Sequence, residues 1–132
     1  MKTLALILVV AGTAVWAVQD KTSQEITAVK SAEIQWTHPD GAPEGMMAFH
    51  VSGDAKQGPI VDFIKFPAGT KVPMHFHSAN HTVTVLSGTL TIGTTGTPET
   101  GKGMEIEAGG YYKIPAKTPH WTAALTKETV IA

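Results

Sequence analysis

The chain has 132 residues, of which 42% are hydrophobic, and its ten lysines and eleven acidic residues leave a formal net charge of −1. This length fits one globular domain, and the absence of cysteine excludes disulfides, zinc ribbons and thiol catalysis. Because the charge is nearly balanced and no basic cluster is present, we expect no nucleic acid partner.

The N-terminal segment predicts export. Lys2 supplies a positive start, residues 4–18 are apolar apart from Thr13, and Ala17 ends a segment of the kind that signal peptidase cleaves. This run of about fifteen residues is short for a bilayer span, which needs about 20. We therefore predict a signal peptide over residues 1–17 and a periplasmic or secreted protein with no stable membrane span after its removal. An uncleaved anchor is the alternative.

The rest of the chain has the pattern of short strands. Residues 18–33 are polar and are expected to form an irregular lead-in to a domain at 34–132. Segments rich in β-formers alternate with turns that contain glycine or proline, and no amphipathic helix interrupts them. Besides a strand start near Trp36, the expected strands are 46–51, 60–66, 82–86, 89–93, 104–107, 111–114, 121–125 and 129–132. Strands of this length and spacing predict an all-β sandwich or barrel.

Three of the six histidines, His75, His77 and His81, lie within seven residues. In an extended chain His75 and His77 project from one face, whereas Phe76 projects from the other, where we expect it in the core. Neutral imidazole is a common ligand of divalent transition metals, so the cluster predicts a metal site. His38 and His50 have no such neighbours and are expected at the surface or behind the ligands.

The segment from Gly69 to Gly88 resembles the first signature motif of the cupin superfamily, Gly-x5-His-x-His-x3or4-Glu-x6-Gly. Residues 109–124 are similar to the second motif, Gly-x5-Pro-x-Gly-x2-His-x3-Asn, with His120 at its histidine position. The likeness is greatest to small single-domain cupins exported by bacteria. It implies a double-stranded β-helix, the cupin jelly-roll barrel. It also implies a divalent transition metal (Fe, Zn, Cu, Ni or Mn) held at the barrel mouth by His75, His77, His81 and His120.

The chain departs from these motifs at three positions. His81 stands where the family has glutamate, Lys117 where it has glycine and Ala124 where it has asparagine. Imidazole in place of a carboxylate leaves an uncharged, all-nitrogen ligand set, which suits Zn, Cu, Ni or Fe better than Mg or Ca. A three-histidine site without His81 is the alternative.

Two functions fit this site. One is a metal-dependent enzyme, a dioxygenase acting on a small enol, diketone or phenolic substrate, as the resemblance to all-histidine cupins implies. The other is a non-catalytic periplasmic module that binds or senses a metal or small ligand. The aromatic candidates for an apolar pocket wall are Phe49, Phe63, Tyr112 and Trp121.

The C-terminal part of the barrel is short, because only twelve residues follow His120. The last strands are short, or the chain continues, or a partner subunit completes the sheet. Pairing of exposed edges makes a homodimer one expected arrangement.

Overall fold

The structure is a computed structural model that describes residues 26–132, so the predicted signal peptide at 1–17 lies outside the described part. A short 3₁₀ helix, η1 (Ser31–Glu33), precedes nine strands. The strands are β1 (Met47–Gly53), β2 (Ile60–Phe66), β3 (Thr70–His75), β4 (His81–Ser87), β5 (Thr89–Gly93), β6 (Met104–Glu107), β7 (Tyr111–Ile114), β8 (His120–Ala124) and β9 (Thr129–Ile131). Within residues 26–132 no helix has the length and apolar character needed to cross a membrane.

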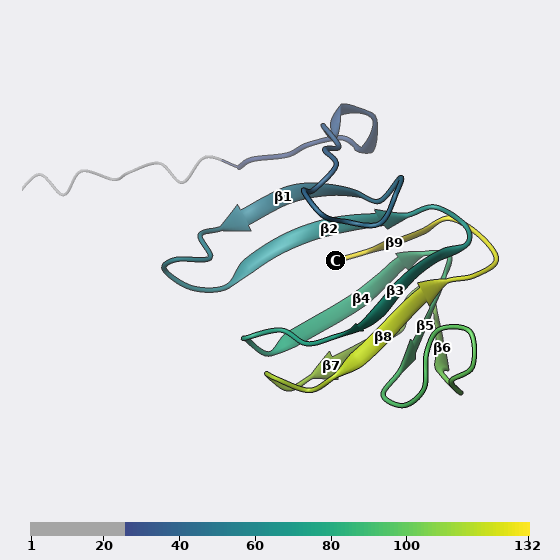
Figure 1. The fold of residues 1–132 in the computed structure, drawn as a ribbon. Coiled ribbons are helices and arrows are strands. Elements are labelled where there is room, and N and C mark those ends of the chain that lie inside the picture. Colours follow the sequence, from purple (N-terminus) through teal and green to yellow (C-terminus); the bar gives the residue numbers. More distant parts are fainter. Residues whose placement is uncertain (1–25) are drawn as a thin grey trace, which may run out of the picture.

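The strands form two antiparallel sheets (Figure 1), with the orders β1-β2-β9-β4-β7 and β3-β8-β5-β6. This confirms the predicted all-β jelly-roll fold. The eight predicted strands each overlap an observed strand, and the ninth, β3, leads into the histidine cluster. A core of buried side chains lies between the sheets and consists of Phe66, Val83, Val85, Leu90, Ala124 and Ile131.

The two sheets separate at one end, where β9 stops. β2 pairs with β9 only from Ile64 to Phe66, so the first half of β2 has no neighbour on that side. β9 also pairs with β4 at Val85 and Ser87. Figure 1 shows the C-terminus between β2 and β4, at the point where the β1–β2 hairpin diverges from the lower strands.

A bulge in β3 sets the direction of the histidines. Val72 pairs with Thr122 and His75 with His120, so β3 holds one residue more than β8 between these pairs. Pro73, which cannot donate a hydrogen bond to a ladder, lies within this bulge. The extra residue brings His75 onto the inner face of the sandwich although it is three residues from the inward Val72.

Candidate metal centre

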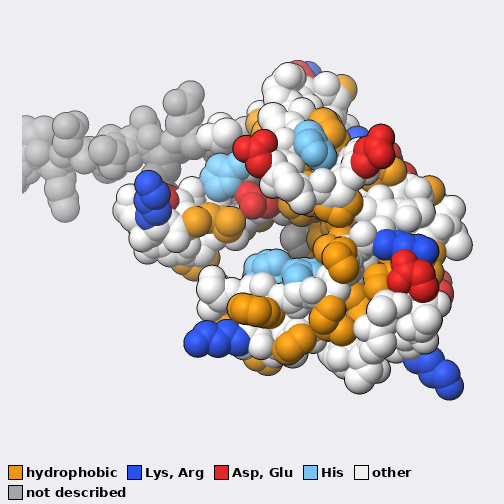
Figure 2. All heavy atoms as spheres, viewed as in Figure 1, with side chains coloured by type: hydrophobic (Ala, Val, Ile, Leu, Met, Phe, Trp, Pro, Cys, Tyr) orange, Lys and Arg blue, Asp and Glu red, His pale blue; other side chains and the backbone are white. Residues whose placement is uncertain are grey.

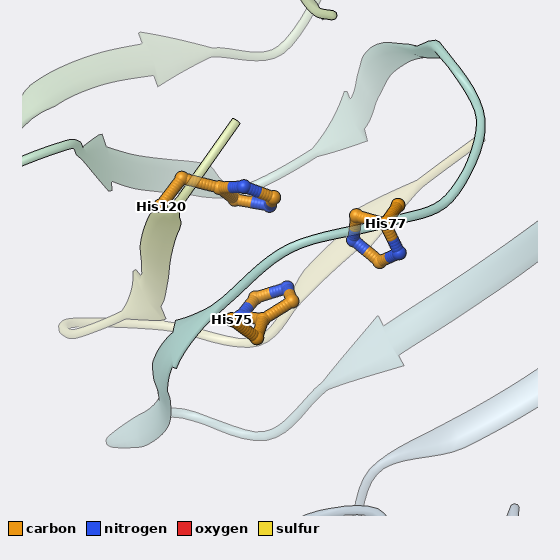
Figure 3. Close-up of side chains that lie close together, drawn as sticks. All are labelled: His75, His77 and His120. Atoms are coloured by element: carbon orange, nitrogen blue, oxygen red, sulfur yellow. The ribbon is translucent and has the colours of Figure 1, made fainter. Parts of the chain in front are cut away.

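Three histidine rings converge at the open end of the sandwich (Figure 3). His75 ends β3, His77 follows it by two residues, and His120 begins β8 directly opposite His75. One ring nitrogen from each lies within 4.8 Å of the other two. His120 is only 2% exposed, and the other two side chains are half-buried.

The ring orientations of two of these residues are fixed by backbone carbonyls. Nδ1 of His75 donates to the carbonyl oxygen of Pro73 at 2.7 Å. Nδ1 of His120 donates in the same way to Thr118 at 3.0 Å. Because a carbonyl oxygen only accepts, the proton is on Nδ1 and the lone pair of Nε2 is free to bind a metal.

The loops that carry His77 and precede His120 are tied to each other. The backbone N–H of Lys117 donates to the carbonyl oxygen of His77 at 2.7 Å. That of Ala116 donates to Oδ1 of Asn80 at 2.9 Å. Lys117 has φ +61°, the left-handed conformation for which glycine is favoured, so the lysine at the family's glycine position keeps the glycine-like backbone.

The cluster favours uncharged imidazoles. The pKa of His77 is lowered to about 4, chiefly because burial disfavours the imidazolium and further because three neighbouring imidazoles repel it. Burial also lowers the pKa of His81. It lowers the pKa of His120 too, although the hydrogen bond to Thr118 opposes this. Neutral rings at pH 7 are the form that binds metal.

The donor set fits a late first-row transition ion. Two nitrogens that bind one zinc ion at about 2.0–2.1 Å lie no more than about 4.2 Å apart. The 4.8 Å spread of the three nitrogens therefore needs only small ring rotations to close. Three neutral imidazoles also leave coordination positions for other ligands, as in catalytic sites.

His81 lies beside this group and not within it. Its ring stacks on that of His77, with centroids 3.7 Å apart and an interplanar angle of 21°. It begins β4, opposite Ile114 of β7. Of the four predicted ligands, the structure thus gathers His75, His77 and His120 and places His81 against one of them.

A cavity of about 480 Å³ opens next to the histidines. Figure 2 shows the hollow between the β1–β2 hairpin and the histidines on the opposite rim. Its apolar walls include Ile60 and Ile64 of β2, Val83 of β4 and Ile131 of β9, and its polar part includes Asp62, His77, Asn80 and His81.

The interpretation of the aromatic residues was wrong. None of the four candidates for the pocket wall lines this cavity. Phe49 and Phe63 pack on each other with ring centroids 6.3 Å apart, Tyr112 packs against the core, and Trp121 is buried at 1% exposure. The aliphatic walls were missed because periodicity did not show which face of β2 is inward.

Phe76 is also not in the core. It projects away from the histidines as predicted, yet its side chain is 64% exposed. The inward side of this segment is the histidine side, and the opposite side faces solvent. His38 and His50 are exposed, as expected; His38 bonds to the carbonyl of Met46, and His50 bonds to Asp62 and to the carbonyl of Gly53.

The fold and the site together define the class of this protein. It is a two-sheet jelly roll with a candidate metal centre of three histidines at its open end. The model of the cupin domain family matches residues 62–132, more than half of the chain. The chain therefore belongs to the cupin domain family. It has no significant match among curated proteins.

Solved cupin structures share the fold. An RmlC-like cupin protein from Ralstonia eutropha JMP134 is 17% identical with a TM-score of 0.63, covering 81% of this chain and 66% of that one. The polyketide cyclase RemF from Streptomyces resistomycificus is 18% identical with a TM-score of 0.64, covering 81% and 76%. KdgF from Halomonas sp. is 19% identical with a TM-score of 0.59, covering 81% and 90%. At these identities the likeness supports the fold.

Proposed function

We propose that this chain is an exported cupin enzyme that binds one divalent transition metal through His75, His77 and His120. Its proposed substrate is a small enol, diketone or phenolic compound, and its proposed reaction is that of a dioxygenase. The observation that carries the proposal is the convergence of three ring nitrogens within 4.8 Å beside a cavity of about 480 Å³. A site of three imidazoles with an adjacent cavity is the arrangement that catalytic metal centres use.

The residues of the chain have separable tasks in this proposal. When bound, a divalent ion among neutral imidazoles supplies a Lewis-acid charge that stabilises an anionic oxygen of the substrate. The carbonyls of Pro73 and Thr118 orient two of the rings. Ile60, Ile64 and Val83 surround the hydrocarbon part of the substrate and exclude water from it.

The second candidate function is non-catalytic binding or sensing of a metal or small ligand. It is favoured by the ring of His81, which stacks on His77 at 3.7 Å between centroids. If His81 turns to become a fourth ligand, a tetrahedral ion has no open position, which is the mark of a structural site. The two functions therefore differ in whether the bound ion keeps exchangeable water.

The metal site is tested by measuring zinc affinity in wild type, His77→Ala and His38→Ala. Even residues that only orient a ligand contribute about 10–100-fold to affinity, so loss of a ligand in His77→Ala is expected to cost at least about 100-fold. His38, whose Nδ1 donates to the carbonyl of Met46, is the matched histidine away from the site, and its variant should bind as wild type does. Equal affinity in all three proteins contradicts the proposal.

Catalysis is tested on protein loaded in turn with Fe, Cu, Ni and Mn. Water-proton relaxation counts the exchangeable water, and an oxygen electrode records consumption with enols and diketones. Stoichiometric metal with open positions and oxygen uptake supports the enzyme. Stoichiometric metal without exchangeable water supports the binding module.

Export and assembly complete the proposal. Export is supported by the apolar segment 4–18, and Val18 is the expected first residue of the mature protein when the N-terminus is sequenced. A homodimer is supported by the edge strands of the sheets, of which β7 is one within the described residues. Light scattering of the purified protein tests the dimer.

A further inference from the structure

An acidic residue lies on the inward face of β2. Ile64 and Phe66 of this strand pack in the hydrophobic core, and side chains two apart in a strand share a face. Asp62 therefore projects to the interior side as well. It lines the same cavity as His77 and His81. A carboxylate at an inward strand position breaks the apolar pattern, and such breaks concentrate at functional sites.

His50 of β1 pairs with this residue. It lies opposite Asp62 in the strand register, and its Nδ1 donates to Oδ1 of Asp62 at 2.7 Å. Its Nε2 donates to the carbonyl oxygen of Gly53 at 3.0 Å. Both partners accept, so the two bonds are made together only by the doubly protonated ring, and they accordingly raise the pKa of His50.

This arrangement leaves one oxygen of the Asp62 carboxylate available to accept a hydrogen bond from a ligand. Oδ1 is occupied by His50, and within residues 26–132 no hydrogen bond reaches Oδ2. With His50 protonated the pair has no net charge, so it does not repel an anionic oxygen bound nearby. An exposed ion pair contributes little to protein stability. Stability of the hairpin therefore does not explain why Asp62 lines the cavity.

We propose that Asp62 is a substrate-binding residue that accepts a hydrogen bond from a hydroxyl group of the ligand. The ligand is a small phenol or enol with two oxygen functions, one directed to the histidine centre and the other to the carboxylate. This inference rests on the proposed function, because it places the second group of the same substrate. It assigns the carboxylate of the site to β2, whereas the family's motif has its glutamate at the position of His81.

The proposal can be measured through the hydroxyl group of the ligand that is expected to bind Asp62. A hydroxyl donates to Oδ2 of Asp62, whereas a methyl ether at the same position cannot donate and covers Oδ2 without giving it a hydrogen bond. Ligands that differ only in this group should therefore be discriminated by Asp62 and by no other acidic residue.

The experiment titrates zinc-loaded protein by calorimetry with catechol, resorcinol, hydroquinone and the monomethyl ether of each. For at least one isomer, wild type is expected to prefer the diol about 10–100-fold, the range of a hydrogen bond to a charged group. In Asp62→Ala this preference should fall to within about threefold, and Asp62→Asn, which keeps the shape but loses the charge, should be intermediate. Asp40→Asn, in the exposed turn before β1, is the matched control and should keep the full preference.

The zinc affinity of each protein is measured first, which separates the two proposals. If wild type binds no zinc, the proposed function fails, and this inference fails with it. If zinc binds normally in wild type and the Asp62 variants but no diol is preferred, or no phenol binds, the inference alone is overturned. A preference that persists in Asp62→Ala also overturns it. If the variants misfold, the wild-type protein alone still tests the inference. Equal binding of each diol and its monomethyl ether to wild type overturns it.

Discussion

The strands β3 and β8, which carry His75 and His120, form one wall of the open end of the sandwich, and the β1–β2 hairpin, which carries Asp62, forms the other. The two walls are held differently. All five residues of β8 are buried, and the strand pairs with β3 on one side and β5 on the other. No residue of β1 is buried, and the β1–β2 hairpin joins the rest of its sheet through three residue pairs between β2 and β9. The histidines therefore belong to a fixed scaffold, whereas the opposite wall can adjust to a ligand.

The difference in packing between the two walls is greatest at Trp121. It is buried on the outer side of β8, and its Nε1 donates to the carbonyl of Thr95 at 2.9 Å. Gly93, Gly101 and Gly103 leave the space that its ring fills, because a Cβ on any of them would collide with the ring. The loop that contains Thr95 thus covers the back of the strand that begins with His120.

The largest effect on stability is expected for Trp121→Ala, with Phe49→Ala in the hairpin as its counterpart. Loss of a buried tryptophan should lower the free energy of unfolding by about 3–5 kcal/mol. Phe49 is half-buried, so its loss should cost about 1–2 kcal/mol. Urea unfolding followed by circular dichroism measures both values. Equal losses would mean that the two walls are equally well packed.

Hydrogen exchange should show the same contrast without a mutation. Amides of β8 that bond to neighbouring strands should exchange at least about 100-fold more slowly than amides of β1, since local opening of the hairpin breaks few buried contacts. Exchange followed by NMR on the wild-type protein measures both rates. Similar protection in the two strands contradicts the idea of an adjustable wall.

The two walls should respond to pH with opposite signs. The folded-state pKa of His77 is about 4 against 6.5 in the unfolded chain, so between these values the unfolded state binds more protons and stability falls as pH falls. The raised pKa of His50 has the reverse effect, because its contribution is present below pH 6.5 and is lost as pH rises through the folded-state pKa.

Urea midpoints of the metal-free protein between pH 4.5 and 7 test these signs. Wild type should lose stability toward pH 4.5, His77→Gln should lose less, and His50→Gln should lose more. Added zinc should raise the midpoint at pH 7, and this increase should shrink as the pH approaches the lowered pKa of His77, about 4, because the ligands must be neutral. A steeper loss in His77→Gln than in wild type is the result that would refute the assignment.

Sequence alone was sufficient for the fold and for the convergence of three histidines. The alternation of β-formers and turns predicted the strands, and alternation in an extended chain placed His75 and His77 on one face. His120 was grouped with them by the resemblance to the second cupin motif. The pairing of β8 with β3 puts His120 opposite His75 and brings the histidines of the two motifs together, as the resemblance implied.

The opposite wall could not be predicted for a physical reason. β2 reads Ile-Val-Asp-Phe-Ile-Lys-Phe, with apolar residues on both faces, so its pattern does not show whether Asp62 points inward. Phe76 was misplaced by a related error, because alternation gives opposite faces but does not say which of them another layer covers. The position of His81 depends on the path of the loop before β4, which local pattern does not determine.

The smallest expected effect concerns the loop that ties the two motifs together. Lys117 has φ +61°, which is strained for a residue with a Cβ, so Lys117→Gly should stabilise the protein by roughly 0.5 kcal/mol after the greater freedom of glycine in the unfolded chain is counted. Lys113→Gly in the extended strand β7 is the matched control and should destabilise by roughly 0.5–1 kcal/mol. Urea unfolding of the two variants measures both changes. Because the backbone N–H of residue 117 still donates to His77 in the glycine variant, zinc affinity should not change. A stability loss in Lys117→Gly would show that the lysine side chain itself stabilises this loop.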